Sequence, residues 1–550
     1  MFLLRRKTVN FLALSMTLLA LAGCAGKPAG QDKPGQPGTK PAKDQVICFN
    51  LGSEPESLDP AVVEGKPEGT LLNAVFDGLV RYGKDNKLQP ALAYRWDISP
   101  DGKRYTFYLR NAQWTNGEPV TAGDFEYAWK RVLDPKTGSS YAYQLFCLKN
   151  GEAYNAGKLK DPSQVGVKAL DDQTLEVTLE APTPHFLGLT AFMTYYPVNK
   201  KVVEANPKKW YMDTASFVTN GPFKLVKWEH NQKLELVKNP TYWEAQQVKL
   251  DKLVMTTVDS NDTALTMFET GQADFVYDPP KTQLARLRQE DKLSISPDVN
   301  TYFYLLNVTK KPFNDVRVRK ALALAIDRES LVQKVTRGGE KPARAFVPEG
   351  LPDVDSAKDF RNAGGPLMDT YNAGEARKLL ADAGYPGGMG FPEVAILFNT
   401  NDNHQKLAQA IQEMWKQNLG INVKLSNQEW KVLLKSQQSL DYDISRASWS
   451  ADYLDAMTFM DMFVTNGGNN YTGWGNKEYD ALIAKAKVTA NSRERIKAMH
   501  DAEKILISEM PVIPLYFSTY SYLQSPRLKD VVVSPFAYYA EFRWAWVSED

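Results

Sequence analysis

The chain has 550 residues, 43% of them hydrophobic and 24% charged, which are proportions typical of a globular protein. Its length predicts two to four domains or one large two-lobed body. The 66 basic and 65 acidic residues nearly cancel, so the composition indicates neither a nucleic-acid-binding surface nor a store of cations.

The N-terminus has the features of a secretion signal. A positively charged segment at residues 5–7 precedes an apolar run at residues 11–20, which is too short to span a membrane comfortably. The run ends in Leu21-Ala22-Gly23-Cys24, which resembles a bacterial lipobox. This resemblance implies that residues 1–23 are removed as a lipoprotein signal peptide and that Cys24 carries a lipid; an uncleaved anchor is the alternative.

Residues 24–44 are expected to form the lipidated cysteine and a flexible tether, because Gly, Pro, Lys and Gln dominate this segment. A lipid, a tether and then a globular body predict a protein attached to the extracytoplasmic face of a cell membrane. The body contains Cys48 and Cys147, which could form a disulfide or remain two thiols. No CxxC motif or histidine-rich cluster indicates a metal site.

Turn residues flanked by alternating apolar residues predict three β-hairpins in the first half of the body, at residues 88–110, 170–179 and 223–237. Helical spacing predicts a helix over residues 70–80. It predicts a second helix over residues 123–133, capped by Thr121 with Asp124 at the third position.

The second half of the body has longer helical patterns. A helix is predicted to begin at Asn314 or Asp315, and another covers residues 403–418 and ends at Gly420. The second helix lies between two strand-like segments around residues 394–425, which is typical of a βαβ unit in a parallel or mixed sheet. Two sheet-containing lobes of different character are therefore expected.

The segment from Arg446 to Tyr453 combines two opposite charges with Trp449 and the hydroxyl residues Ser448 and Ser450. In an extended chain, the six-residue spacing puts Arg446 and Asp452 on the same side, at most roughly 20 Å apart. Such a segment could hold both ends of a zwitterionic chain such as a short peptide. A surface loop with unrelated charges is the alternative.

Several of these segments together resemble family 5 of the extracellular solute-binding proteins, which supply ABC importers. The resemblance lies in residues 88–135, 312–319 and 430–453, and it extends over nearly everything from residue 45 to the C-terminus. It is closest to the oligopeptide-binding branch, through residues 399–404, 427–430 and 446–453.

The resemblance implies an α/β, bilobed fold of the periplasmic-binding-protein type (type II, cluster C) with a hinged ligand cleft between the lobes. By matching motifs, lobe I comprises residues 45–76, 201–299 and 519–550. An extra domain of lobe I comprises residues 77–200, and lobe II comprises residues 300–518.

The resemblance also implies roles for particular residues. Asp452 is expected to accept the α-ammonium group of a peptide, since a desolvated ammonium needs a negative partner; a helix cap or a surface charge is the alternative. Arg446 and His404 match positions that meet peptide carboxylates, although His404 could be only a polar helix start. The remaining expected site residues are Glu64 and Tyr141 on the opposite wall, Ser448 for backbone hydrogen bonds, Trp430 as the wall of a side-chain pocket unless it belongs to the core, and Trp449 and Ser450 on the same strand.

Some positions depart from the pattern of close enterobacterial relatives. A disulfide in those relatives corresponds to Asn300 and Ser450 here, so that bond is absent. A lysine used there for very short peptides aligns with Thr336, and an arginine used for longer ones aligns near Gln437. The preferred peptide length is therefore left open.

The expected function is that of a lipid-anchored receptor, acting as a monomer, that captures short peptides and delivers them to the transmembrane subunits of an ABC permease. No enzymatic activity, cofactor or nucleic-acid partner is expected. One alternative keeps the fold and binds a chelated metal or a sugar oligomer. A peptide hydrolase is disfavoured, because the sequence has neither Gly-x-Ser-x-Gly nor His-Glu-x-x-His and its four histidines are scattered.

Overall fold

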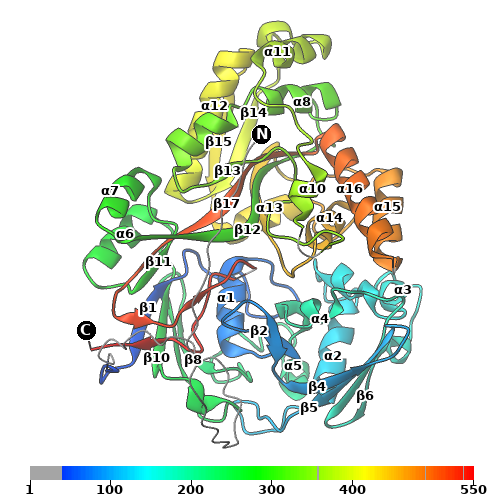
Figure 1. The fold of residues 1–550 in the computed structure, drawn as a ribbon, viewed down its shortest axis with the longest axis vertical. Helices are drawn as coiled ribbons and strands as arrows, with labels where there is room; N and C mark the ends of the chain where they lie inside the picture. The colour runs from blue at the N-terminus through cyan, green and yellow to red at the C-terminus, as the bar shows by residue number, and fades with distance from the viewer. Residues whose placement is uncertain (1–39, 356–357, 490, 537, 550) are drawn as a thin grey trace, which may run out of the picture. The chain divides into compact units, whose positions relative to one another are not determined.

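The computed structural model describes residues 40–355, 358–489, 491–536 and 538–549 (Figure 1). The predicted signal peptide, Cys24 and most of the predicted tether lie outside these residues. Within the described part of the chain, no helix combines the length and apolar character needed to cross a membrane.

A mixed sheet of 11 strands runs through the body of the protein. Its long strands β12 and β17 pair antiparallel, and their register shifts between Pro297 and Thr301. In spatial order the sheet contains β15 (Val423–Gln428), β14 (Val394–Asn399), β16 (Ile444–Ser450), β12 (Leu293–Leu306), β17 (Val512–Gln524), β11 (Phe275–Tyr277), β1 (Val46–Asn50), β10 (Lys252–Thr256), β9 (Lys233–Lys238) and β8 (Phe223–Glu229), with β13 (Lys341–Pro342) paired to β17.

The predicted βαβ unit is confirmed. Strands β14 and β15 are parallel neighbours, and α12 (Asp402–Leu419) connects them. The side chain of Asn401 caps the start of α12, and Gly420 ends it with a left-handed φ of 71°, a conformation that glycine adopts without strain. Because α12 follows β14 directly, the first turn of α12 lies near the C-terminal end of β14.

A second sheet, separate from the first, has four strands in the order β4 (Ala93–Ile98), β5 (Arg104–Leu109), β7 (Thr174–Thr178) and β6 (Val167–Asp171). The predicted hairpins are confirmed in it and in the β8–β9 pair. Helix α2 (Ala122–Leu133) packs on this sheet and begins at Thr121, whose backbone N–H donates to the Asp124 carboxylate at 2.9 Å. This is the capping arrangement that the sequence predicts.

The helix predicted at residues 70–80 is misplaced. Helix α1 covers Lys66–Val75, and Pro67 in its first turn favours the earlier start. The chain turns extended at Phe76, because the backbone N–H of Gly221 donates to the Val75 carbonyl and the Asn220 side chain accepts from Asp77. The end of this helix is therefore set by a segment distant in the sequence.

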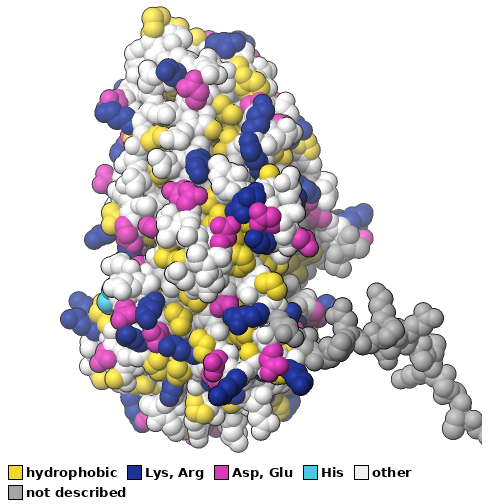
Figure 2. Space-filling view, turned by 90° about the vertical axis from the view of Figure 1, so that its left-hand side faces the viewer, with side chains coloured by type: hydrophobic (Ala, Val, Ile, Leu, Met, Phe, Trp, Pro, Cys, Tyr) yellow, Lys and Arg dark blue, Asp and Glu magenta, His cyan; other side chains and the backbone are white. Residues whose placement is uncertain are grey.

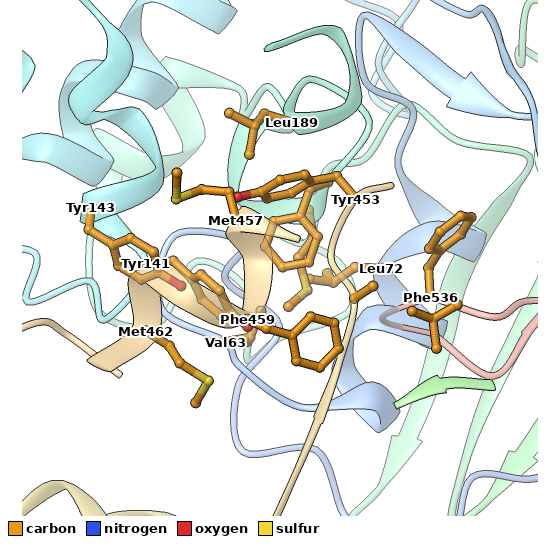
Figure 3. Close-up of a cluster of buried hydrophobic side chains, with 14 of the residues drawn as sticks. Val63, Leu72, Tyr141, Tyr143, Leu189, Tyr453, Met457, Phe459, Met462 and Phe536 are labelled. Carbon is orange, nitrogen blue, oxygen red and sulfur yellow. The ribbon is translucent and has the colours of Figure 1, made fainter. Parts of the chain in front are cut away.

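Apolar side chains from several segments pack around residues 453–463 (Figure 3). Tyr453, Met457 and Phe459 come from the loop after β16 and from α14 (Met457–Met460), while Leu72 comes from α1 and Leu189 from α4 (Phe186–Leu189). All five are buried. This packing fixes the loop that follows β16 in place.

The outer surface is of mixed charge. On the face in Figure 2, basic and acidic side chains are interspersed, as the near-zero net charge leads one to expect. Inside, Cys48 and Cys147 are both free thiols, which decides between the two alternatives for them. Burial raises the pKa of each thiol to about 11.

Candidate functional site

All nine residues predicted for the site line one cavity of about 240 Å³. They reach it from separate parts of the chain: the loop before α1, the start of η1 (Ala142–Cys147), the first turn of α12, the first residue of α13 (Trp430–Gln438), β16 and the loop after it. The residues are Glu64, Tyr141, His404, Trp430, Arg446, Ser448, Trp449, Ser450 and Asp452.

Asp452 provides a buried carboxylate without a cationic partner. It is 4% exposed, and it accepts hydrogen bonds from Gln144 Nε2 at 2.8 Å and from the Tyr141 hydroxyl at 3.5 Å. Within the described residues, no lysine or arginine lies within 4.0 Å of it. Burial, with Asp461 nearby, raises the pKa of Asp452 well above its ordinary value. The site therefore holds a buried carboxyl group that has no cation beside it to favour its charged form.

Arg446 is the opposite case, a half-buried cation. Its guanidinium donates to Asn399 Oδ1 at 3.3 Å and to Ser448 Oγ at 3.1 Å, and it lies 4.9 Å above the centre of the Tyr302 ring. Both polar partners are neutral, and no carboxylate in the described part of the chain forms an ion pair with it. Arg446 is therefore free to pair with a carboxylate from outside the chain.

His404 lies beside Arg446 and shares a hydrogen bond between its Nδ1 and the Tyr302 hydroxyl, at 3.1 Å. Burial, together with Arg446 and Lys281, lowers the pKa of His404 well below its ordinary value. The imidazole is therefore neutral. This limits the predicted role of His404, because it can offer a carboxylate a hydrogen bond but no charge.

Strand β16 has a free edge facing away from β12. All of its residues pair with β12, but β14 pairs with it only at Ile444 and Ser445. The Ala451 N–H donates to the Val299 carbonyl, so by antiparallel alternation the backbone groups of residues 446, 448 and 450 point away from β12. The Arg446 carbonyl already accepts a hydrogen bond from Gln437 Nε2 at 2.8 Å. The backbone groups of Ser448 and Ser450 remain on the open edge.

The opposite wall carries Glu64 and Tyr141. Glu64 accepts hydrogen bonds from the Tyr471 hydroxyl at 2.6 Å and from Gln438 Nε2 at 2.9 Å, and burial raises its pKa. The Trp449 ring lies 5.9 Å from that of Tyr141, and its buried indole N–H has no hydrogen-bond partner among the described residues. These residues form a largely aromatic wall with a few polar groups.

The structure adds functional candidates that the sequence did not single out. Gln144 holds the Asp452 carboxylate, and Asn403 and Lys281 link α12 to the loop after β11. No local pattern points to Gln144, because it lies in a short 3₁₀ helix with an irregular sequence. Lys406, on the same helix as His404, also lines the cavity.

Hydrogen bonds join the two positions at which the resemblance implies a disulfide in enterobacterial relatives. Asn300 and Ser450 are directly opposite in the β12–β16 pair, where Asn300 Nδ2 donates to Ser450 Oγ at 2.6 Å. Asn300 Oδ1 accepts from Ser518 Oγ, also at 2.6 Å. Directly opposite residues of an antiparallel pair lie at a separation that a disulfide can span.

We expect the double variant Asn300→Cys, Ser450→Cys to form a disulfide that stabilises the protein by about 2–4 kcal/mol, because the bond closes a long loop of the unfolded chain. The melting temperature should rise under oxidising conditions and fall to the wild-type value or below on reduction, since the Asn300–Ser518 hydrogen bond is lost. An oxidised protein that melts at or below the temperature of its reduced form would contradict this geometry.

Among the described residues, no group of three or more His, Cys, Asp or Glu side chains is arranged to hold a metal ion. The charged groups of the cavity are instead distributed around it. The cavity thus combines a buried carboxyl group, a half-buried cation, an open strand edge and aromatic walls.

Known proteins resemble this chain in sequence and in fold. The family model of the bacterial extracellular solute-binding proteins, family 5, matches residues 87–471. Over 541 residues the chain is 43% identical to the dipeptide-binding protein DppE of Bacillus subtilis (strain 168), and the aligned region covers 97% of each chain. The fold is thus that of a solute-binding protein. The chain belongs to family 5 of the bacterial extracellular solute-binding proteins, and the expected bilobed α/β fold class is confirmed.

Two solved structures indicate which conformation is present. Haemophilus influenzae OppA in complex with the peptide RPPGFSPFR matches with a TM-score of 0.86 at 34% identity, covering 93% of this chain and 100% of that one. The murein tripeptide-binding protein MppA in its unliganded open form matches with a TM-score of only 0.61 at the same identity, covering 93% and 99%. The present arrangement is therefore like the peptide complex rather than the open form.

Proposed function

We propose that this protein is the substrate-binding component of an ABC importer and that its cavity takes short peptides with a free amino terminus. The observation that carries the proposal is the buried, unpaired carboxylate of Asp452 at one end of an open strand edge, with the unpaired Arg446 at the other end. A buried charge without a partner is unfavourable, so the site is complementary to a ligand that supplies the opposite charges.

The open edge of β16 explains how many different peptides could bind. An extended ligand can pair its main chain with the Ser448 and Ser450 backbone, which gives affinity without recognising side chains. Ligand side chains would then point toward the walls formed by residues such as Trp430 and Trp449. Waters in the remaining space would accommodate side chains of different size.

Binding would be coupled to closure of two lobes about a hinge. We place the lobes at the boundaries expected from the sequence, which puts residues 298–300 of β12, where the register shifts against β17, at a crossing between them. Across the cleft, Asn403 on α12 accepts from the Lys281 backbone N–H at 3.1 Å and donates to Asp278 Oδ2 at 3.0 Å. These bonds would form only when the lobes meet.

Asn403→Ala should therefore lower the affinity for all peptides alike, by about three- to tenfold. The substitution removes hydrogen bonds of the closed form but none of the groups that bind the charged peptide ends. Calorimetric titration with free and N-acetylated peptides measures this directly. Gln405→Ala, at an exposed position on the same helix, is the matched control. A loss confined to one class of peptide would show that Asn403 contacts the ligand instead.

The lipid on Cys24 and the tether would hold the monomeric protein at the extracytoplasmic face of the membrane, where it would deliver peptides to the permease. The dipeptide-binding name of one relative and the peptide bound in the structure of another support peptides as cargo. A chelated metal or a sugar oligomer fits less well, because neither offers separate positive and negative ends to Asp452 and Arg446.

Native mass spectrometry of the purified protein tests the proposal. Co-purified masses should form a series of peptides, and added tri- to pentapeptides should raise the melting temperature and be recovered intact. Recovery of cleaved peptides would favour the hydrolase alternative. If no peptide mass is found and no peptide shifts the melting temperature, the proposal is wrong.

A further inference from the structure

A contact beside the cavity joins the residue before α4 to the loop after β16. The imidazole of His185 is stacked on the ring of Tyr453, with the ring centres 4.9 Å apart and the planes inclined by only 8°. Helix α4 also supplies Leu189 to the apolar cluster around Tyr453 (Figure 3). Tyr453 directly follows Asp452, so this contact supports the loop that carries the Asp452 carboxyl group.

A hydrogen bond determines the protonation state of His185. Arg495, on α16 (Ser492–Glu509), approaches His185 Nδ1 with Nη2 at 3.2 Å. A guanidinium group can only donate, so Nδ1 has to accept and carries no proton. The imidazole is therefore neutral in this arrangement. A proton on Nδ1 would break the hydrogen bond and bring two cations into contact.

The charged groups around His185 also oppose its protonation. Asp455 accepts hydrogen bonds from Arg495 at 2.8 and 2.9 Å, so its carboxylate is already paired with that guanidinium. Burial lowers the pKa of His185 to about 4; Asp455 counteracts this shift, whereas Arg495 and Lys487 add to it.

The contact spans the two lobes. With the lobes placed at the boundaries expected from the sequence, His185 belongs to the extra domain of lobe I, whereas Tyr453 and Arg495 belong to lobe II. The contact is present in an arrangement that resembles the peptide complex. Separation of the lobes would expose the imidazole to water, and its pKa would return toward the ordinary value of about 6.5. Protonation of His185 would therefore favour the open form.

We propose that His185 is a positioning residue for peptide binding, which allows the lobes to close fully only while its imidazole is neutral. This inference rests on the proposed peptide function, and His185 acts through Tyr453 and Arg495. The contribution of His185 to affinity is complete above about pH 6.5 and is lost as the pH falls toward about 4, where both forms are protonated. The protein would thus hold peptides at neutral pH and release them in acid.

The test compares two substitutions of His185. His185→Phe keeps a ring to stack on Tyr453, His185→Gln keeps an acceptor for Arg495, and neither can take up a proton. His230→Gln is the control, since the His230 side chain on the β8–β9 turn is 61% exposed. Each full-length protein is titrated calorimetrically with one tripeptide at about pH 8 and about pH 5. Between these values, wild type and the control should lose roughly tenfold more affinity than either His185 variant.

Proton release gives a second, independent readout. Titrations at about pH 5.5 in buffers with different heats of ionisation count the protons released on binding. Wild type should release about one proton more per peptide than either His185 variant. Protons exchanged by Glu64, His404 and Asp452 cancel in this difference, because every protein retains those groups.

The same pH dependence and the same proton release in wild type and in both His185 variants would overturn the inference, because the imidazole would then serve only to pack the lobes. A pH dependence that is lost equally in His230→Gln would also overturn it. If wild type binds no tripeptide even at about pH 8, the proposed function itself fails, which distinguishes the two failures.

Discussion

Asp452→Asn should lower the affinity for peptides with a free amino terminus by roughly a hundredfold or more, because removing one member of a buried ion pair costs about 3–5 kcal/mol. The same change should have a much smaller effect on N-acetylated peptides, which bring no positive charge to Asp452. Calorimetric titration of both peptide types against both proteins gives the comparison. Equal losses would refute the role of Asp452 as the ammonium acceptor.

The same variant should make the ligand-free protein more stable. Burial raises the pKa of Asp452 in the folded state, so its favourable contribution is complete only below the unfolded value of about 3.9 and is lost as pH rises through the folded pKa. At neutral pH the carboxyl group is charged in the unfolded chain, whereas burial disfavours that charge in the ligand-free fold, so Asp452 lowers the free energy of unfolding and asparagine removes this penalty. The gain in melting temperature should shrink as the pH falls toward the unfolded value.

Opposite changes in stability and in affinity distinguish a binding residue from a residue that only supports the fold. A residue that only holds the fold together loses both when it is replaced, whereas a binding residue held in an unfavourable state gains stability when binding is lost. Gln144 donates a hydrogen bond to the Asp452 carboxylate. Replacing Gln144 should therefore not raise the stability as Asp452→Asn does, because Asp452 then loses a hydrogen-bond donor. A less stable ligand-free Asp452→Asn would show that the carboxylate serves the fold.

Arg446→Gln should lower the affinity for short peptides with a free C-terminus by about tenfold to a hundredfold, because a hydrogen bond to a charged group contributes roughly 1.5–3 kcal/mol. Glutamine keeps a hydrogen-bond donor near Ser448 but has no charge. Short C-terminal amides should bind the variant and the wild type alike, as measured by calorimetric titration. A similar loss for acids and amides would indicate that Arg446 mainly orders β16 through Ser448 and Asn399.

The effect of Arg446→Gln on affinity should depend on peptide length. Peptides too long to place their C-terminal carboxylate at Arg446 should bind almost as tightly when Arg446 is replaced.

Local patterns were sufficient for many elements of the fold. Thr121 with Asp124 predicted the start of α2, and Gly420 predicted the end of α12, since both depend on neighbours within a few residues. The end of α1 could not be predicted in this way, because Asn220 and Gly221 fix it from more than a hundred residues away. Whether the lobes divide at the expected residues stays a prediction.

The candidate site was predictable where it resembles a family and not where it depends on packing. The Arg446–Asp452 spacing pointed to two charged ends, and the resemblance supplied the opposite wall at Glu64 and Tyr141. The neutral state of His404 could not be foreseen, because it arises from burial beside Arg446 and Lys281. Gln144 and Lys406 were missed because only the folded chain shows what Asp452 contacts and which cations are paired.

The most direct test of the account is calorimetric titration of the wild-type protein with one tripeptide and with its N-acetylated form. The account predicts that acetylation lowers the affinity by roughly a hundredfold or more, since it leaves the buried carboxylate of Asp452 without a cation. Equal affinity for the two forms would contradict the account, because the Asp452 end of the cavity would then not recognise a peptide amino terminus.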